Sequence, residues 1–238
     1  MSDQTTNKAR ITEFLRDHLK TNPVVNIEAD SGIFQVWTYH FSVTHEDYFR
    51  LLRKQTTDLP IITTWHMILH SMVRTCVNKC AFLNPYKIPG EACQKYPEGV
   101  ASYLVDAMRL HHGKLFLIAP YLQNKHWVLL VTCPRNRTVY VLDSLKKSVE
   151  KPVDTYCLLK RHVEIAFTRY EKDITPIEWI LAKCNQQLGI LESEHYLMRW
   201  MFDFVLTKQY GFPNKNIELL QFDVWNNPST IGSMMLFL

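Results

Sequence analysis

The sequence predicts an α+β fold in which a central block of strands is flanked by helices. Three short, nearly continuous apolar runs lie in the middle of the chain: "KLFLIAPYL" (114–122), "HWVLLVT" (126–132) and "TVYVLDSL" (138–145). Runs of this kind are typical of buried strands covered on both faces. The segments before and after this block space their apolar residues as helices do. Helices, then strands, then helices indicate an α+β layer architecture.

Ahead of the strand block, apolar spacing, β-branched and aromatic composition, and helix-capping signals predict five elements. In chain order they are an amphipathic helix within 7–20, a strand at 32–44, a helix capped by Thr44, an apolar helix at 61–77 and a helix at 99–113. Asn22 and Pro23 end the first helix. Three prolines and two glycines indicate a loop over 84–99.

After the strand block, helical spacing returns at 153–167, and "IEWILAKC" (177–184) predicts a last strand. A final helix at about 194–209 is apolar nearly all round, which predicts that it is buried in the core. No internal repeat is visible.

Composition excludes several classes of protein. The chain has 238 residues, 27 basic and 23 acidic, and the scattered charge of +4 does not favour a nucleic-acid partner. The polar N-terminus has no signal core, and no apolar run is long enough to span a bilayer. We therefore expect a soluble intracellular protein, nuclear or cytoplasmic, without a membrane partner. Its six cysteines are expected to be free thiols.

The pair "HWVLLVT" and "TVYVLDSL" predicts a hairpin that turns at "CPRNR". His126 and Asp143 are equidistant from that turn, so they are expected to face each other at the open end of the hairpin. A carboxylate beside an imidazole fixes its tautomer and raises its basicity. The alternative is an edge histidine and a strand-terminal aspartate that match by chance.

Ser193 stands at the start of the buried last helix. A helix N-terminus concentrates unpaired N–H groups and partial positive charge, which suits a nucleophile or an oxyanion. Serine is also a favoured N-cap residue, and a serine at this position, taken alone, is more often only a cap.

The blocks that carry these residues resemble the ubiquitin-like-protein-specific (SUMO) cysteine protease family, in particular divergent members of plant genomes that are often carried by transposons. The shared blocks, in family order, are His-Trp opening a strand, Asp-Ser-Leu ending the next, "CNQQ" (184–187), the triplet "ESE" (192–194) and "YLMR" (196–199) before an apolar helix. "AFLNP" (81–85) and "LIAPYLQNKHWVLLV" (117–131) are similar to the plant members as well. The resemblance implies a papain-like cysteine protease fold, with a central antiparallel sheet flanked by helices.

The resemblance also implies a role for five residues. His126 matches the general base, and Asp143 matches the residue that orients it. Gln187, six residues before Ser193, matches the oxyanion glutamine. Ser193 occupies the place of the nucleophilic cysteine, and Trp127 matches the tryptophan that lines the channel for the diglycine tail of the modifier.

Two departures from the family pattern bear on activity. Ser193 replaces cysteine, and a hydroxyl is far less acidic than a thiol, so it must lose its proton during the attack. Glu194 replaces glycine and puts a carboxylate beside the place where negative charge develops. The loop "LGILE" (188–192) is also more apolar than in the family. The family activity is hydrolysis after the diglycine of a ubiquitin-like modifier, and we expect this chain to be weakly active or inactive as a cysteine-type peptidase. The alternatives are a pseudoprotease module that binds a ubiquitin-like protein, and a transposon-derived remnant.

Other candidate sites have simpler explanations. Cys184 ends the preceding strand in the family and is not catalytic there. A zinc site would need His66 and His70 together with Cys76 and Cys80, but the helix that carries the histidines reads as core packing. We expect no cofactor and no metal.

The resemblance covers about residues 35 to 210. It divides the chain into an N-terminal extension (1–34), a ubiquitin-like protease family domain (35–210) and a divergent C-terminal tail (211–238). The implied partner is a SUMO-like modifier or its conjugates, and the protein is expected to be a monomer.

Overall fold

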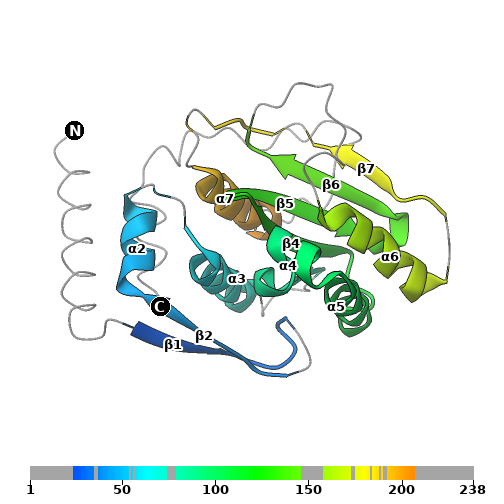
Figure 1. The fold of residues 1–238 in the computed structure, drawn as a ribbon, viewed down its shortest axis with the longest axis horizontal. Helices are drawn as coiled ribbons and strands as arrows, with labels where there is room; N and C mark the ends of the chain where they lie inside the picture. Colours follow the sequence, from blue (N-terminus) through cyan, green and yellow to red (C-terminus); the bar gives the residue numbers. More distant parts are fainter. Residues whose placement is uncertain are drawn as a thin grey trace.

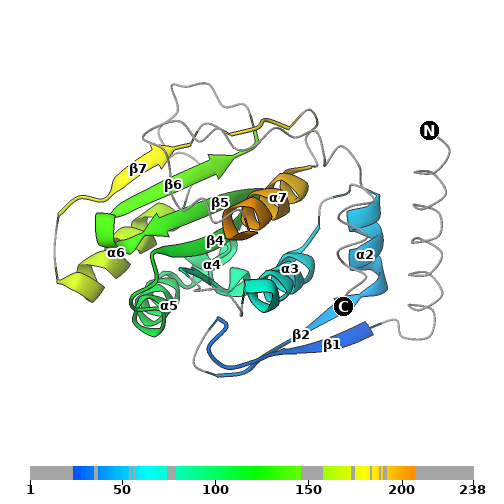
Figure 2. The ribbon, with the colours of Figure 1, turned by 180° about the vertical axis from the view of Figure 1, so that it is seen from behind.

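The computed structural model describes residues 24–34, 37–53, 55, 57–73, 79–145, 158–172, 175–182, 184–187, 189 and 192–206. The helix expected within 7–20 and the tail at 211–238 lie outside these residues. The described part has three layers, with a twisted sheet between two groups of helices (Figures 1 and 2). The predicted α+β class is confirmed.

The sheet has five strands, in the order β3-β4-β5-β6-β7. They are β3 (Cys80–Phe82), β4 (Phe116–Gln123), β5 (His126–Cys133), β6 (Thr138–Asp143) and β7 (Glu178–Leu181). The three central strands are antiparallel, as expected, but β3 is parallel to β4 and β7 is parallel to β6, so the sheet is mixed. The parallel edges follow from the helical crossovers that lead into β4 and β7, whereas tight turns join the central strands.

Alternate residues of the central strands face two separate hydrophobic cores. Leu129 and its neighbours on one face pack with α3 (Leu59–Val73) and α7 (Ser193–Leu206). Leu130 and its neighbours on the other face pack with α4 (Gly90–Lys95), α5 (Pro97–Leu110) and α6 (Leu159–Glu171). Figures 1 and 2 show these helix groups on opposite sides of the sheet. Burial on both faces explains why the strands read as continuous apolar runs.

The prediction of a loop over 84–99 is wrong in part, because this segment contains the short 3-10 helix η1 (Pro85–Lys87), α4 and the start of α5. Pro85 and Pro97 occupy first-turn positions, where a missing N–H costs nothing. Gly90 lies against β4, and a Cβ there would come within 3.1 Å of the Gln123 side chain. In this segment proline occupies the first turn of helices, and glycine allows close packing against β4, so neither interrupts a helix.

A second sheet consists of the hairpin β1 (Val24–Ala29) and β2 (Tyr39–Thr44). The strand expected at 32–44 is confirmed only from Tyr39, and the sequence analysis missed β1. The helix expected after Thr44 is α2 (His45–Leu52), and Thr44 caps it in a capping box with Asp47.

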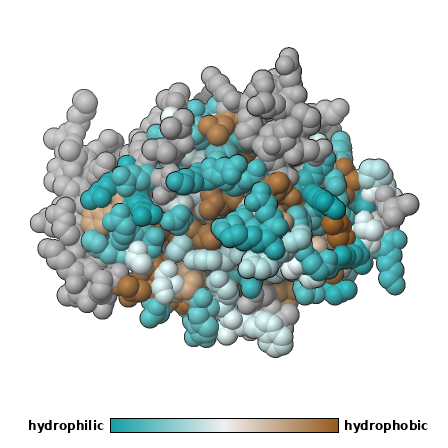
Figure 3. All heavy atoms as spheres, viewed as in Figure 1, coloured by the Kyte–Doolittle hydropathy of each residue, from teal (hydrophilic) through white to brown (hydrophobic). Residues whose placement is uncertain are grey.

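The face seen in Figure 3 is mostly hydrophilic, with small separate apolar patches. Within the described residues, no helix combines the length and the apolar character needed to cross a bilayer.

Candidate active site

The β5–β6 hairpin brings His126 and Asp143 together, although its register differs from the expected one. Asp143 lies opposite Val128, not opposite His126. The turn is a 3-10 segment, η2 (Pro134–Asn136), followed by Arg137 in the left-handed region at φ 51°, so the first pair is Cys133 with Thr138. Because residues two apart share a face, His126 becomes the diagonal neighbour of Asp143 and still reaches it.

His126 Nε2 lies 2.7 Å from Asp143 Oδ1, and the two side chains are 13% and 2% exposed. A nitrogen that faces a carboxylate carries the proton, so Nε2–H donates to Asp143. The other ring nitrogen, Nδ1, is then left with its lone pair. It is buried and has no hydrogen-bond partner among the described residues. This is the arrangement of an oriented imidazole base.

Ser193 is the first residue of α7 and is buried. Its Oγ accepts a hydrogen bond of 3.1 Å from the backbone N–H of Trp127. The start of α7 is therefore tied to the start of β5, one residue from His126. No hydrogen bond joins Ser193 to His126 Nδ1.

The side chain of Trp127 is fully buried, and its Nε1–H donates to the carbonyl oxygen of Thr57 at 3.0 Å. In this conformation the indole does not line an open channel. The sequence analysis missed Thr57, which carries no signal of its own because only its backbone oxygen takes part.

Gln187 lies beside the strand end that carries Asp143. Its backbone N–H donates to Ser144 O at 2.8 Å, and its Oε1 accepts from the Ser144 hydroxyl at 2.6 Å. Its Nε2 donates to Gly189 O at 2.8 Å. The side-chain amide is therefore engaged by its own surroundings. Gln186, which the sequence analysis did not single out, donates to the carbonyl oxygen of Asp143 at 3.0 Å.

Glu194 follows Ser193 in the first turn of α7 and has no exposed surface. Neither of its carboxyl oxygens makes a hydrogen bond within the described part of the chain. Burial raises the pKa of this carboxyl to about 8. Its own backbone N–H and the neighbouring Ser193 hydroxyl lower the pKa, while the negative charge of Glu192 raises it further. At neutral pH Glu194 is mostly uncharged, so the fixed negative charge expected beside the site is largely suppressed.

Comparisons with known proteins agree with this geometry. Residues 102–191 match the model of the Ulp1 protease family, C-terminal catalytic domain, which is over a third of the chain and ends just before Ser193. No curated protein matches the chain significantly.

Solved structures of SUMO proteases and of a Xanthomonas campestris effector have a similar fold. SUMO protease Ulp1 with its catalytic cysteine oxidised to a sulfenic acid has a TM-score of 0.64 at 13% identity, over 100% of this chain and 95% of that one. The Chaetomium thermophilum Ulp1-like SUMO protease catalytic domain has a TM-score of 0.56 at 11% identity, over 94% and 86%. Xanthomonas campestris effector XopD, bound to ubiquitin, has a TM-score of 0.54 at 15% identity, over 77% and 91%.

The chain has the fold of the Ulp1-like SUMO proteases, and the Ulp1 family model matches part of it. Its matched segment contains the strands that carry His126 and Asp143, together with Gln187.

Two other candidates have structural roles in the Ulp1-like domain. The Cys184 thiol contacts Asp143 O at 3.3 Å, and burial raises its pKa to about 12, which disfavours a thiolate. His66 is fully buried between the rings of Phe34 and Phe82, and burial lowers its pKa to about 3. Among the described residues no group of three His, Cys, Asp or Glu side chains could hold a metal ion, and Cys76 lies outside them.

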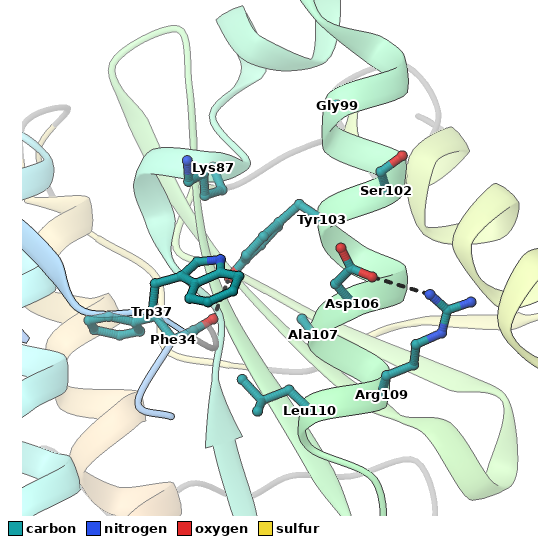
Figure 4. Close-up of a pocket in the computed structure, with 10 residues that line it drawn as sticks. All are labelled: Phe34, Trp37, Lys87, Gly99, Ser102, Tyr103, Asp106, Ala107, Arg109 and Leu110. Atoms are coloured by element: carbon teal, nitrogen blue, oxygen red, sulfur yellow. Dashed lines mark hydrogen bonds and ion pairs between the residues drawn. The ribbon is translucent and has the colours of Figure 1, made fainter. Parts of the chain in front are cut away.

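A hollow of about 680 Å³ lies between the β1–β2 connection and α5. Figure 4 shows the indole of Trp37 and the ring of Tyr103 at this hollow, with Asp106 paired to Arg109 at 3.3 Å. None of its lining residues belongs to the candidate active site. It is therefore a surface feature separate from the His126–Asp143 pair.

Proposed function

We propose that this chain processes or binds a SUMO-like, ubiquitin-like modifier at its diglycine tail. The observation that carries the proposal is the 2.7 Å pair of His126 and Asp143 beside Ser193, at the start of a buried helix in a Ulp1-like domain. In this proposal His126 is the base and Asp143 orients it. The indole of Trp127, which is fully buried in this conformation, lines the diglycine channel when a modifier opens it. A Ulp1 structure in complex with SMT3, the yeast ortholog of SUMO, supports a modifier of this class.

The proposed reaction is acyl transfer. A nucleophile at position 193 attacks the carbonyl carbon of the second glycine, the amine leaves, and water releases the modifier. Gln187 would stabilise the oxyanion after its amide leaves Gly189 O. Cys184 takes no part, because its thiol is half-buried and hydrogen-bonded to the carbonyl oxygen of Asp143.

We infer that peptidase turnover is low because Ser193 stands in the place of a cysteine. A thiol is ionised by a neighbouring imidazole before it attacks, whereas a hydroxyl must transfer its proton during the attack. Ser193 Oγ is hydrogen-bonded to Trp127 N and not to His126 Nδ1, so the geometry for that transfer to His126 is not formed in this conformation.

A non-catalytic binding module is the second candidate, favoured by the absence of this Ser193–His126 hydrogen bond. In that case the protein acts as a monomer in the nucleus or cytoplasm and holds a modifier or its conjugates. A plant transposon-derived remnant without selected activity is the third.

One experiment separates these candidates. The protein is mixed with SUMO precursors that carry an extension after the diglycine, and binding and cleavage are measured on the same samples. Binding with cleavage at least about 1,000-fold slower than a cysteine enzyme is the expected result. Binding without cleavage, by the wild type and by the Ser193→Ala control alike, supports the module. The absence of both contradicts the proposed function.

A further inference from the structure

The carbonyl oxygen of Asp143 lies just beyond the point where β6 and β7 stop pairing. Among the described residues this pairing ends at Val141 with Leu181, and Ala182 N–H still donates to Val141 O at 2.9 Å. Carbonyl groups two residues apart on a strand point the same way, so Asp143 O also faces the side on which β7 has ended. Asp143 is buried, and a buried carbonyl oxygen at this position takes a donor from outside the sheet.

Gln186 supplies such a donor from its side chain. Its Nε2 lies 3.0 Å from Asp143 O and 3.1 Å from Cys184 O. The amide nitrogen carries two N–H groups, so each of the two carbonyl oxygens receives one of them. The Cys184 thiol lies 3.3 Å from the same Asp143 oxygen, but a thiol is a weak donor. Gln186 is therefore the stronger of these two donors.

The backbone of Gln186 contacts the helix half of the site. The Tyr196 hydroxyl, about one turn into α7 from Ser193, donates to Gln186 O at 3.3 Å. Gln186 is thus hydrogen-bonded through its side chain to the strand that carries Asp143. Through its backbone it is hydrogen-bonded to the helix that begins at Ser193.

The Asp143 carboxylate depends on the position of this strand end. Its Oδ1 accepts His126 Nε2–H at 2.7 Å and the backbone N–H of Leu145 at 3.0 Å. Leu145 lies past the end of β6, so the carboxylate and one of its donors both move with the backbone at 143–145. A backbone shift of about 1 Å away from β5 would take the His126–Asp143 pair out of hydrogen-bonding range.

We propose that Gln186 is a positioning residue that holds Asp143, and through it the His126 imidazole, in place for acyl transfer. The inference rests on the proposed function and adds a residue to its machinery. The Gln186 side chain takes the place of a strand partner where β7 has ended. The Tyr196 hydroxyl fixes the distance between this strand end and the helix of the nucleophile.

The first test needs no turnover. It follows the NMR signal of the His126 Nε2 proton in the full chain, prepared with isotope-labelled histidine. A proton held by Asp143 exchanges slowly with water, so the wild type should show the signal. Gln186→Met, which keeps the side-chain length without a donor, should lose it, and Gln186→Lys, which restores a donor, should regain it. Cys184→Ala, the matched control, removes the weaker donor to the same oxygen and should keep the signal.

The second test measures labelling by a thiol-directed diglycine probe in the Ser193→Cys/Glu194→Gly background, which provides a thiol. Adding Gln186→Met should slow labelling about tenfold, because the base is no longer aligned. Gln186→Lys should recover most of the rate, and Cys184→Ala should change it less than about twofold. Tyr196→Phe should slow labelling about threefold, since the side-chain donor of Gln186 remains.

Three results would overturn the proposal: a wild type without the His126 signal, a Gln186→Met variant that keeps it, or an equal loss in Cys184→Ala. If Gln186→Met does not fold in urea-unfolding measurements, Gln186→Asn replaces it, because the shorter side chain draws the amide away from Asp143 O. A Ser193→Cys/Glu194→Gly parent that the probe leaves unlabelled contradicts the proposed function. The His126 signal then still shows whether Gln186 holds the pair.

Discussion

The candidate site has two halves that differ in how their polar groups are satisfied. The strand half, at the ends of β5 and β6, is closely hydrogen-bonded: His126 to Asp143 at 2.7 Å, and Ser144 to Gln187 at 2.6 Å. The helix half, at the start of α7, contains a buried Glu194 whose carboxyl makes no hydrogen bond within the described residues. The hydrogen-bonded pair that the proposal assigns as base and orienter is in place, and the difference lies at the start of α7, where the proposed nucleophile stands.

The largest effect should appear as a pH-dependent stability that originates in the helix half. The pKa of Glu194 is about 8 in the folded protein and near 4.5 in the unfolded chain, so the folded state holds a proton that the unfolded state releases between these values. The free energy of unfolding contributed by this group is therefore highest below pH 4.5 and falls as pH rises to about 8. The fall is on the order of 3 to 5 kcal/mol.

Glu194→Gln should remove most of that fall, because the amide has the same shape but does not ionise. Urea unfolding at pH 5, 7 and 9 measures the free energy of unfolding. Glu192→Gln changes a partly exposed carboxyl, so this control should keep most of the decrease in stability with pH. If Glu194→Gln and the wild type lose stability in parallel from pH 5 to pH 9, ionisation of the buried carboxyl is not the source of the pH dependence assigned to the helix half.

A smaller effect should come from the strand half. Ser144→Ala removes the donor to Gln187 Oε1 and leaves a buried acceptor unsatisfied, at a cost of about 1 to 2 kcal/mol. The loss should not depend on pH between 5 and 9, since neither group titrates there. Ser71→Ala, which removes an exposed hydrogen bond to Ile68 O, is the matched control and should cost under about 0.5 kcal/mol. A pH-dependent loss for Ser144→Ala would mean that the two halves are coupled.

The sequence alone predicts the strand half better than the helix half, for physical reasons. β4 to β6 are apolar on both faces because both faces are covered, and their tight turns restrict the pairing, so the proximity of His126 and Asp143 could be expected. Their register could not, because the 3-10 turn with Arg137 at positive φ shifts the pairing by two residues. β1 was not predicted, because the strand is short, half-exposed and partly polar.

The burial of Glu194 could not be predicted, because acidic residues in a first helical turn usually remain exposed and favour the helix dipole. Only the packing of α7 against β5 and α3 shows that this carboxyl is enclosed and has a raised pKa. The resemblance to cysteine proteases suggests that Ser193 and Glu194 belong to the site, and the structure shows that both side chains are buried.

The central claim is that an intact base stands beside a changed nucleophile. The most direct test is labelling of position 193 by a thiol-directed diglycine probe. At pH 9, where Glu194 is ionised, we expect none in the wild type and slow labelling in Ser193→Cys, because the Glu194 carboxylate opposes a thiolate. Ser193→Cys/Glu194→Gly should be labelled at least tenfold faster, and His126→Ala added to that pair should abolish the gain. A folded double variant that the probe leaves unlabelled, or labelling that does not depend on His126, would contradict the account.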